Sequence, residues 1–161
     1  MNLGHIDEHE YFLGRLVASF QSLELLLVEY FASLINWEDR EIGYIISDGL
    51  SFKKLVTAVD ALAKHKESEA QYATLKASLD ACLKLEEERN RYVHGYWDLS
   101  PKGTDKLEWV WFKRRNRLGK GNVHTEDKLT SDLDGFVLRS TAVQESLRKR
   151  IRKPSKGPTR R

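Results

Sequence analysis

The sequence is poor in cysteine, whose disulfides stabilise many small secreted proteins. Its 161 residues include one cysteine, Cys82, so no disulfide can form within the chain. Chains without disulfides are typical of reducing compartments, and we therefore expect a cytoplasmic protein. Cys82 lies in an apolar, helix-like stretch with no basic residue adjoining it, which favours a small buried hydrophobic residue over a reactive thiol.

Several other sequence features are missing, and each absence argues against one class of protein or binding site. No uninterrupted apolar run reaches the roughly 18 residues that a membrane span needs, and no basic segment followed by an apolar one opens the chain, so we expect neither a membrane anchor nor a secretory signal. The phosphate-binding patterns GxxxxGK[ST] and GxGxxG do not occur. His5 and His9 have a spacing that lets two imidazoles share a metal, but no third ligand can be placed. We predict no metal site and no cofactor.

Proline is also scarce, with three residues, and none precedes position 101. The first part of the chain can therefore form long helices. Apolar residues at helical spacing predict one helix over about 7–36, a second over 52–65 with Ser51 as its N-cap, and a third over about 68–94. Residues 37–49 interrupt the helical spacing of apolar residues, and Gly43 and Asp48-Gly49 are typical turn signals.

In the second part of the chain, the helical spacing of apolar residues gives way to short β-prone segments. The short aromatic segment 107–112, a glycine-rich bend and residues 123–125 predict a β-hairpin. A last helix begins near Ser131 and ends before Pro154. We predict a mainly α protein: a helical bundle with a small β-hairpin insertion before the C-terminal helix. Residues 1–153 form a single domain, and residues 154–161 form a disordered basic tail.

Positive charge is unevenly distributed. Residues 148–161 hold eight basic and no acidic side chains, which leaves 19 basic against 24 acidic residues in 1–147, a net charge of −5. A second basic run follows two tryptophans. Such blocks favour polyanions, and tryptophans can stack on bases, although a solvated terminus and ordinary hairpin packing are the alternatives. The candidate nucleic-acid-binding residues are Arg91, Trp109, Trp111, Lys113, Arg114, Arg115 and Arg117.

The segment EERNRYVHGYW, residues 87–97, carries the clearest candidate chemistry. Asn90 and His94 are four residues apart and share one face of a helix. Arg89 and His94 are five apart, about 140° around an ideal helix, so they converge only if the last turn distorts or if a second chain completes the site. Histidine is suited to proton transfer near neutral pH, and arginine to binding phosphate. The alternative is a capping histidine beside surface arginines. A second Arg–His pair, Arg117 and His124, lies in the glycine-rich bend, where nothing fixes the two side chains together.

Arg89-Asn90-x-x-x-His94 resembles the signature of the HEPN superfamily, small helical domains of many prokaryotic ribonucleases, in which arginine, a polar residue and histidine follow this spacing. Extended to Tyr96, the pattern R-x4-H-x-Y is similar to toxins of HEPN/MNT toxin–antitoxin pairs. The motif covers only residues 89–96. The predicted hairpin and the basic tail depart from the toxin pattern.

The resemblance implies a metal-independent endoribonuclease that cleaves RNA by attack of the 2′-hydroxyl. In it, His94 is the general base, Arg89 stabilises the phosphate charge and Asn90 orients either group. It further implies a homodimer with the site at its two-fold interface. A role in a toxin pair or in phage defence would add an antitoxin or nucleotidyltransferase partner, with Tyr96 as a modification or accessory site. The competing hypothesis is a non-catalytic HEPN-like dimeric module that binds nucleic acid or a protein partner.

Overall fold

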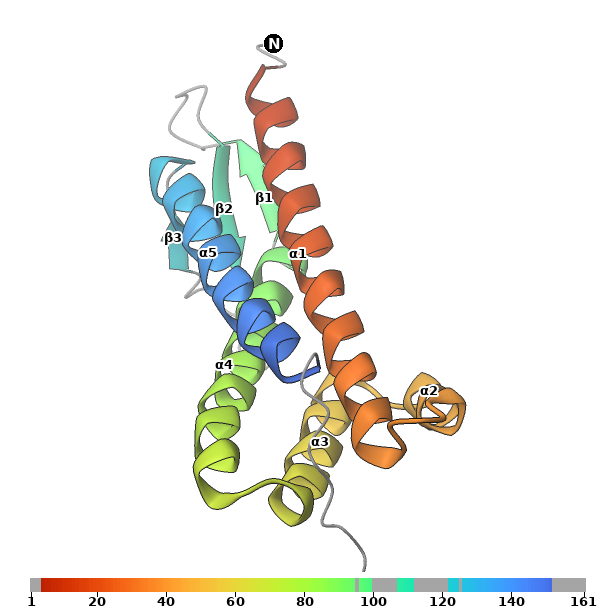
Figure 1. Ribbon diagram of the computed structural model, residues 1–161. Helices are drawn as coiled ribbons and strands as arrows, with labels where there is room; N and C mark the ends of the chain where they lie inside the picture. The colour runs from red at the N-terminus through yellow and green to blue at the C-terminus, as the bar shows by residue number, and fades with distance from the viewer. Residues whose placement is uncertain (1–3, 95, 100–106, 112–121, 125, 152–161) are drawn as a thin grey trace, which may run out of the picture.

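The computed structural model describes the backbone of residues 4–94, 96–99, 107–111, 122–124 and 126–151, and the side chains of residues 10–94 and 131–151. Within these ranges the chain is mainly helical, as the sequence predicts (Figure 1). The helices and strands, in chain order, are α1 (Gly4–Ile35), α2 (Glu41–Asp48), α3 (Phe52–Lys66), α4 (Glu69–Val93), β1 (Tyr96–Leu99), β2 (Leu107–Trp111), β3 (Asn122–His124) and α5 (Glu126–Ile151).

Helix α1 is the centre of the bundle, and α3, α4 and α5 pack around it. Its buried residues recur every three or four positions, which places them on one stripe of the helix. The stripes of the other helices meet this one in a single apolar core. The fully buried members include Leu16, Leu23, Leu27, Leu55, Val59, Leu75, Leu79, Cys82, Leu133, Phe136 and Leu147. The prediction of a buried Cys82 is therefore confirmed.

The apolar character of α1 exceeds what the sequence reasoning allowed. By length and composition alone, the helical segment Glu10–Ile35 could cross a membrane. A core helix satisfies the same criterion, and in this fold Phe20, Tyr30 and Phe31 belong to the central cluster. The stripe of α1 that faces the bundle is buried, whereas Tyr11 and Leu25 are 64% and 66% exposed.

Helix α2 lies within residues 37–49, where the sequence shows a break in the helical pattern and predicts no helix. Gly43, which suggested a turn, is buried where α2 crosses α1: a Cβ on it would lie 2.4 Å from the Cα of Ala32 and 2.6 Å from its Cβ. Glycine is present here because the two helix backbones approach too closely for any side chain. A glycine in a short segment does not distinguish this role from a turn.

The helix starts at Ser51 and Ser68 agree closely with the sequence prediction. Both residues adopt extended backbone angles at the N-cap positions of α3 and α4. The side-chain oxygen of Gln71 accepts hydrogen bonds from the backbone N–H of Ser68 at 3.3 Å and from its hydroxyl at 2.9 Å. Ser51 makes no side-chain cap bond. Helix α5 begins at Glu126, five residues earlier than expected.

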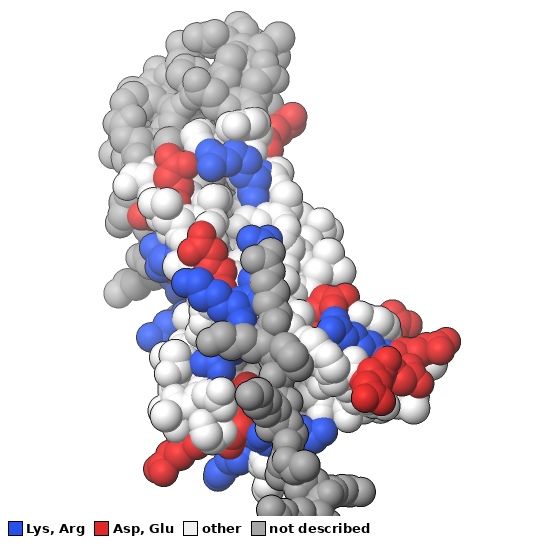
Figure 2. Space-filling model, viewed as in Figure 1, with Lys and Arg blue, Asp and Glu red and all other residues white. Residues whose placement is uncertain are grey.

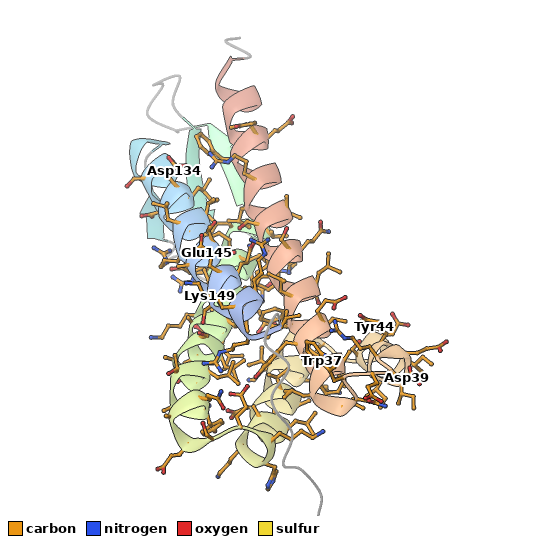
Figure 3. The ribbon with its side chains drawn as sticks, in the orientation of Figure 1. Trp37, Asp39, Tyr44, Asp134, Glu145 and Lys149 are labelled. Carbon is orange, nitrogen blue, oxygen red and sulfur yellow. The ribbon has the colours of Figure 1, made fainter. Side chains whose placement is uncertain are left out.

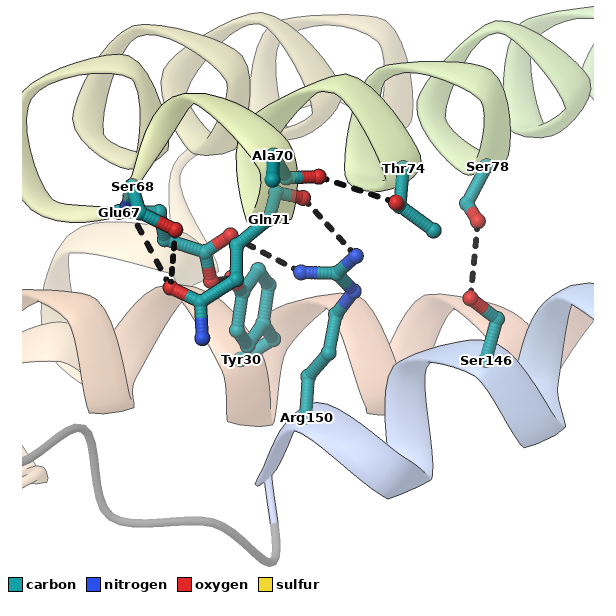
Figure 4. A network of polar contacts seen from close by, with 9 residues as sticks. All are labelled: Tyr30, Glu67, Ser68, Ala70, Gln71, Thr74, Ser78, Ser146 and Arg150. Atoms are coloured by element: carbon teal, nitrogen blue, oxygen red, sulfur yellow. Dashed lines mark hydrogen bonds and ion pairs between the residues drawn. The ribbon is translucent and has the colours of Figure 1, made fainter.

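A polar network joins the end of α5 to α1 and to the turn between α3 and α4 (Figure 4). Arg150 donates to Glu67 at 2.9 Å and to the carbonyl of Gln71 at 3.0 Å, and Tyr30 donates to Glu67. The side chains of Arg150 and Glu67 are each 14% exposed. Arg150 was counted with the basic block that could bind polyanions, but it is a structural ion-pair partner instead.

The three strands form one antiparallel sheet in the order β1-β2-β3. Strands β2 and β3 lie where the sequence predicts the two arms of a hairpin, and β1 is a third strand that was not expected. The pairing places the Cα of Trp109 between its partners Trp97 and His124. Gly95, the basic run 113–117 and the tail 154–161 lie outside the described residues.

Candidate active site

The Arg89–His94 segment is the last turn and a half of α4. This end of α4 lies in the middle of the molecule, among α1, α5 and the start of β1 (Figure 1). The side chains of Arg89 and Asn90 are half-buried, whereas Arg91 and His94 are exposed. The sequence therefore turns one face of the helix end inward and leaves its histidine accessible.

Arg89 is held in a defined position by two neighbours. One terminal nitrogen of its guanidinium, Nη1, donates to the side-chain oxygen of Asn90 at 2.9 Å. The guanidinium carbon lies 5.3 Å from the ring centroid of Phe20, a cation–π contact with α1. Nε of Arg89 is buried and has no hydrogen-bond partner among the described residues. Because buried polar atoms are nearly always paired, this unpaired nitrogen is an exception; it meets a ligand only if the neighbouring side chains move aside.

His94 is the C-cap of α4. Its backbone N–H donates to the carbonyl of Asn90 at 3.1 Å, with φ −104° and ψ 8°. His94 is exposed, and no hydrogen bond joins its imidazole to another described residue. The segment thus offers an exposed proton carrier one turn beyond an oriented arginine.

Arg89 and Asn90 are brought together, but Arg89 and His94 are not. The α-helical bond at His94 remains intact, so the last turn does not distort in the way that would bring the two side chains to the same point. Arg89 instead folds onto Asn90 and Phe20. In one chain, therefore, the pair flanks the end of the helix rather than converging.

The surroundings of the motif are rich in carboxylates. Burial raises the pKa of Glu86, one turn before Arg89, while the positive charges of Lys53 and Arg89 oppose the rise. Glu88 pairs with Arg139 of α5 at 2.7 Å. Burial raises the pKa of Tyr92 to about 12, with the charges of Asp132 and Glu88 acting in the same direction. Tyr92 therefore stays neutral and helps to anchor the helix end.

The other candidate residues are placed only in part. Tyr96, Trp109 and Trp111 lie on β1 and β2, but their side chains are outside the described set, as are Lys113, Arg114, Arg115 and Arg117. His124 lies on β3, and its Cα pairs with that of Trp109.

Phe20 is the neighbour that sequence reasoning missed. It lies on the apolar stripe of α1, and its ring also packs on Phe52, with centroids 4.6 Å apart. No sequence signal distinguishes an aromatic core residue from one that also contacts a guanidinium 69 positions away.

Among the described residues, no group of three or more His, Cys, Asp or Glu side chains is arranged to hold a metal ion. Comparison with protein-family models, with curated proteins and with solved structures found no match to this chain.

Proposed function

We propose that the protein is a metal-independent endoribonuclease of the HEPN type, with Arg89 and His94 as its catalytic residues and Asn90 as the residue that positions Arg89. The observation that carries the proposal is the state of Arg89. Its guanidinium is oriented by Asn90 and Phe20, yet its buried Nε has no partner among the described residues. A pre-positioned arginine with an unpaired donor is suited to a phosphate once the neighbouring side chains move aside to admit one.

In the proposed reaction, a neutral His94 takes the proton from the ribose 2′-hydroxyl. The 2′-oxygen then forms a bond to the adjacent phosphorus, and the bond from phosphorus to the 5′-oxygen breaks. A water molecule gives a proton to the departing 5′-oxygen, and His94 later releases its proton to solvent. Arg89 stabilises the negative charge that grows on the non-bridging oxygens. The products are a 2′,3′-cyclic phosphate and a 5′-hydroxyl.

The active form in this proposal is a homodimer. Arg89 and His94 of one chain do not meet, and the intact hydrogen bond at His94 leaves little room for the helix end to bring them together. A two-fold axis near the end of α4 would set the arginine of one subunit against the histidine of the other.

The biological setting follows from the same resemblance. We infer a cytoplasmic enzyme that acts on RNA and serves as a toxin or in phage defence. In a toxin pair, the partner would be an antitoxin or a nucleotidyltransferase that modifies Tyr96, two residues after His94 on β1.

A non-catalytic HEPN-like module that binds nucleic acid or a protein is the second candidate. It is favoured by one observation: Arg89 of α4 contacts the ring of Phe20 of α1, as an arginine that only fastens α4 to α1 would. In that case RNA binding, if present, would not depend on His94.

The two candidates separate in one experiment. The wild-type protein and His94→Ala are incubated with total RNA in EDTA, and the ends of the fragments are analysed. We expect cyclic phosphate and 5′-hydroxyl ends from the wild type and a loss of about 10²-fold or more in rate for the variant. DNA and 2′-O-methyl RNA should not be cut. Equal rates for the two proteins would contradict the ribonuclease assignment and leave the binding module.

A further inference from the structure

Helix α2 presents an isoleucine face to solvent. Ile42 is 54% exposed, Ile45 is 69% exposed and Ile46 is 47% exposed. On a helix these three side chains lie within one turn of each other and form a continuous strip, the α2 strip. Scattered exposed apolar residues are ordinary, but three adjacent isoleucines on an eight-residue helix suggest a contact surface.

The opposite face of α2 is fixed to the bundle. Gly43 sits against Ala32, and Ser47 is buried, its hydroxyl bonded to the carbonyl of Tyr44 at 2.8 Å. The phenol of Tyr44 donates to Glu29 of α1 at 2.8 Å. Since the close approach at Gly43 fixes which face of α2 is inward, the helix cannot turn to bury its isoleucines without losing these contacts.

The rim of the strip is acidic. Glu38, Asp39, Glu41 and Asp48 are all exposed on or just before α2, and Figure 2 shows acidic side chains gathered over this projection of the molecule. The nearby cation, Arg40, is already engaged: it pairs with Glu29 at 2.8 Å and lies 4.5 Å from the centroid of the Trp37 ring. Figure 3 places Trp37, Asp39 and Tyr44 around the same helix. The rim therefore carries net negative charge.

We propose that the α2 strip is a docking site for a basic amphipathic segment of a protein partner, with apolar side chains that cover the isoleucines and lysine or arginine side chains that pair with the acidic rim. The charge argues against other occupants. Two copies of α2 packed face to face would bring acid against acid, and the rim repels nucleic acid and anionic lipid. Residues 152–161 are basic but contain no large apolar side chain, so they can meet the rim and not the isoleucines.

This surface is separate from the proposed catalytic residues. Among the described residues, the hydrogen bonds and ring contacts of Arg89, Asn90 and His94 do not involve α2. The inference therefore stands whether or not the protein cleaves RNA.

Two synthetic helical peptides with the same leucine pattern test the proposal: one has lysine and the other glutamate at every polar position. Binding of each labelled peptide is measured by fluorescence anisotropy with the full chain. We expect the lysine peptide to bind and the glutamate peptide not to bind. Ile45→Asp should weaken lysine-peptide binding at least about tenfold, since the substitution puts a charge at the centre of the strip. Glu41→Gln with Asp48→Asn should weaken it several-fold and flatten its salt dependence.

Leu138→Asp is the matched control, because Leu138 is a lone apolar residue of α5, 72% exposed. It should bind like the wild type. Equal affinity of wild type and Ile45→Asp for the lysine peptide would overturn the proposal. So would a wild-type homodimer that Ile45→Asp converts to monomer in sedimentation, because a second copy would then cover the strip. Circular dichroism of each variant checks that the fold is kept.

Discussion

At the scale of single residues, burial fixes the protonation of two groups, Cys82 and Tyr92. Burial raises the pKa of the Cys82 thiol from 9.0 to about 12, and that of the Tyr92 phenol from 10.0 to about 12. The unfolded chain releases these protons from about pH 9 upward, while the folded chain keeps them. Their contribution to stability is therefore complete below pH 9 and is lost as pH rises toward 12.

We expect the free energy of unfolding, measured by urea titration, to fall between pH 9 and 11. Each group contributes a slope of up to about 1.4 kcal/mol per pH unit. Cys82→Ala should lower the stability at pH 7 but flatten the fall between pH 9 and 10, where the thiol of the unfolded chain titrates first. An identical pH dependence in the two proteins would show that the thiol is not shielded in the way the fold requires.

Two glycines in helices should respond to alanine in opposite directions. At Gly43 a new Cβ would meet Ala32 at 2.4 Å, so Gly43→Ala should cost about 1–3 kcal/mol and loosen α2. At Gly14 of α1 nothing lies within 4 Å, so Gly14→Ala should stabilise by about 0.5–1 kcal/mol through helix propensity. Thermal unfolding followed by circular dichroism measures both; a harmless Gly43→Ala would contradict the close crossing of α1 and α2.

The sequence alone was enough to group Arg89, Asn90 and His94, because Asn90 and His94 share a helix face and the three residues fit the R-x4-H pattern. It could not place Phe20 against Arg89, since that contact depends on how α1 and α4 cross. The role of Arg150 was obscured for a related reason. A run of basic residues in sequence does not show which of them meets a buried carboxylate.

At the scale of elements, two Arg–Glu pairs tie α5 to the rest of the bundle and should differ in strength. Arg150 pairs with Glu67 at 2.9 Å with both side chains 14% exposed, and Arg139 pairs with Glu88 at 2.7 Å with side chains 55% and 30% exposed. Removing one partner of a buried pair leaves an uncompensated charge, whereas an exposed pair is screened.

Arg150→Met should therefore cost about 3 kcal/mol or more, and Arg139→Met about 1 kcal/mol or less. Both substitutions keep a long apolar stem, so the comparison isolates the charge and its hydrogen bonds. Urea unfolding at pH 7 measures both. Equal losses would mean that the Glu67 network does not fasten the end of α5.

The helix elements were well predicted where apolar residues keep a long 3.6-residue period, as in α1, α3 and α4. Helix α2 was missed because eight residues carry too little periodicity, and its outward isoleucines and buried glycine reverse the usual pattern. Strand β1 was missed because its four residues directly follow the motif and show no alternation of their own.

At the scale of the whole molecule, the central claim is that Arg89 of one subunit and His94 of another form one site. The separation of the two side chains on an intact helix end makes this claim necessary if they act together. The two residues can be identified from the sequence. The interface that would bring them together cannot, because it depends on how the surfaces of two chains fit.

Subunit mixing tests this claim most directly. Arg89→Ala and His94→Ala are each expected to be nearly inactive on RNA in EDTA. After equal amounts are mixed and allowed to exchange subunits, about half of the dimers are hybrids, and each hybrid has one intact Arg89–His94 pair across its interface. The account predicts recovery of about a quarter of wild-type cleavage, with cyclic phosphate ends. A mixture that stays as inactive as its components, although hybrids form, would contradict a site shared between subunits.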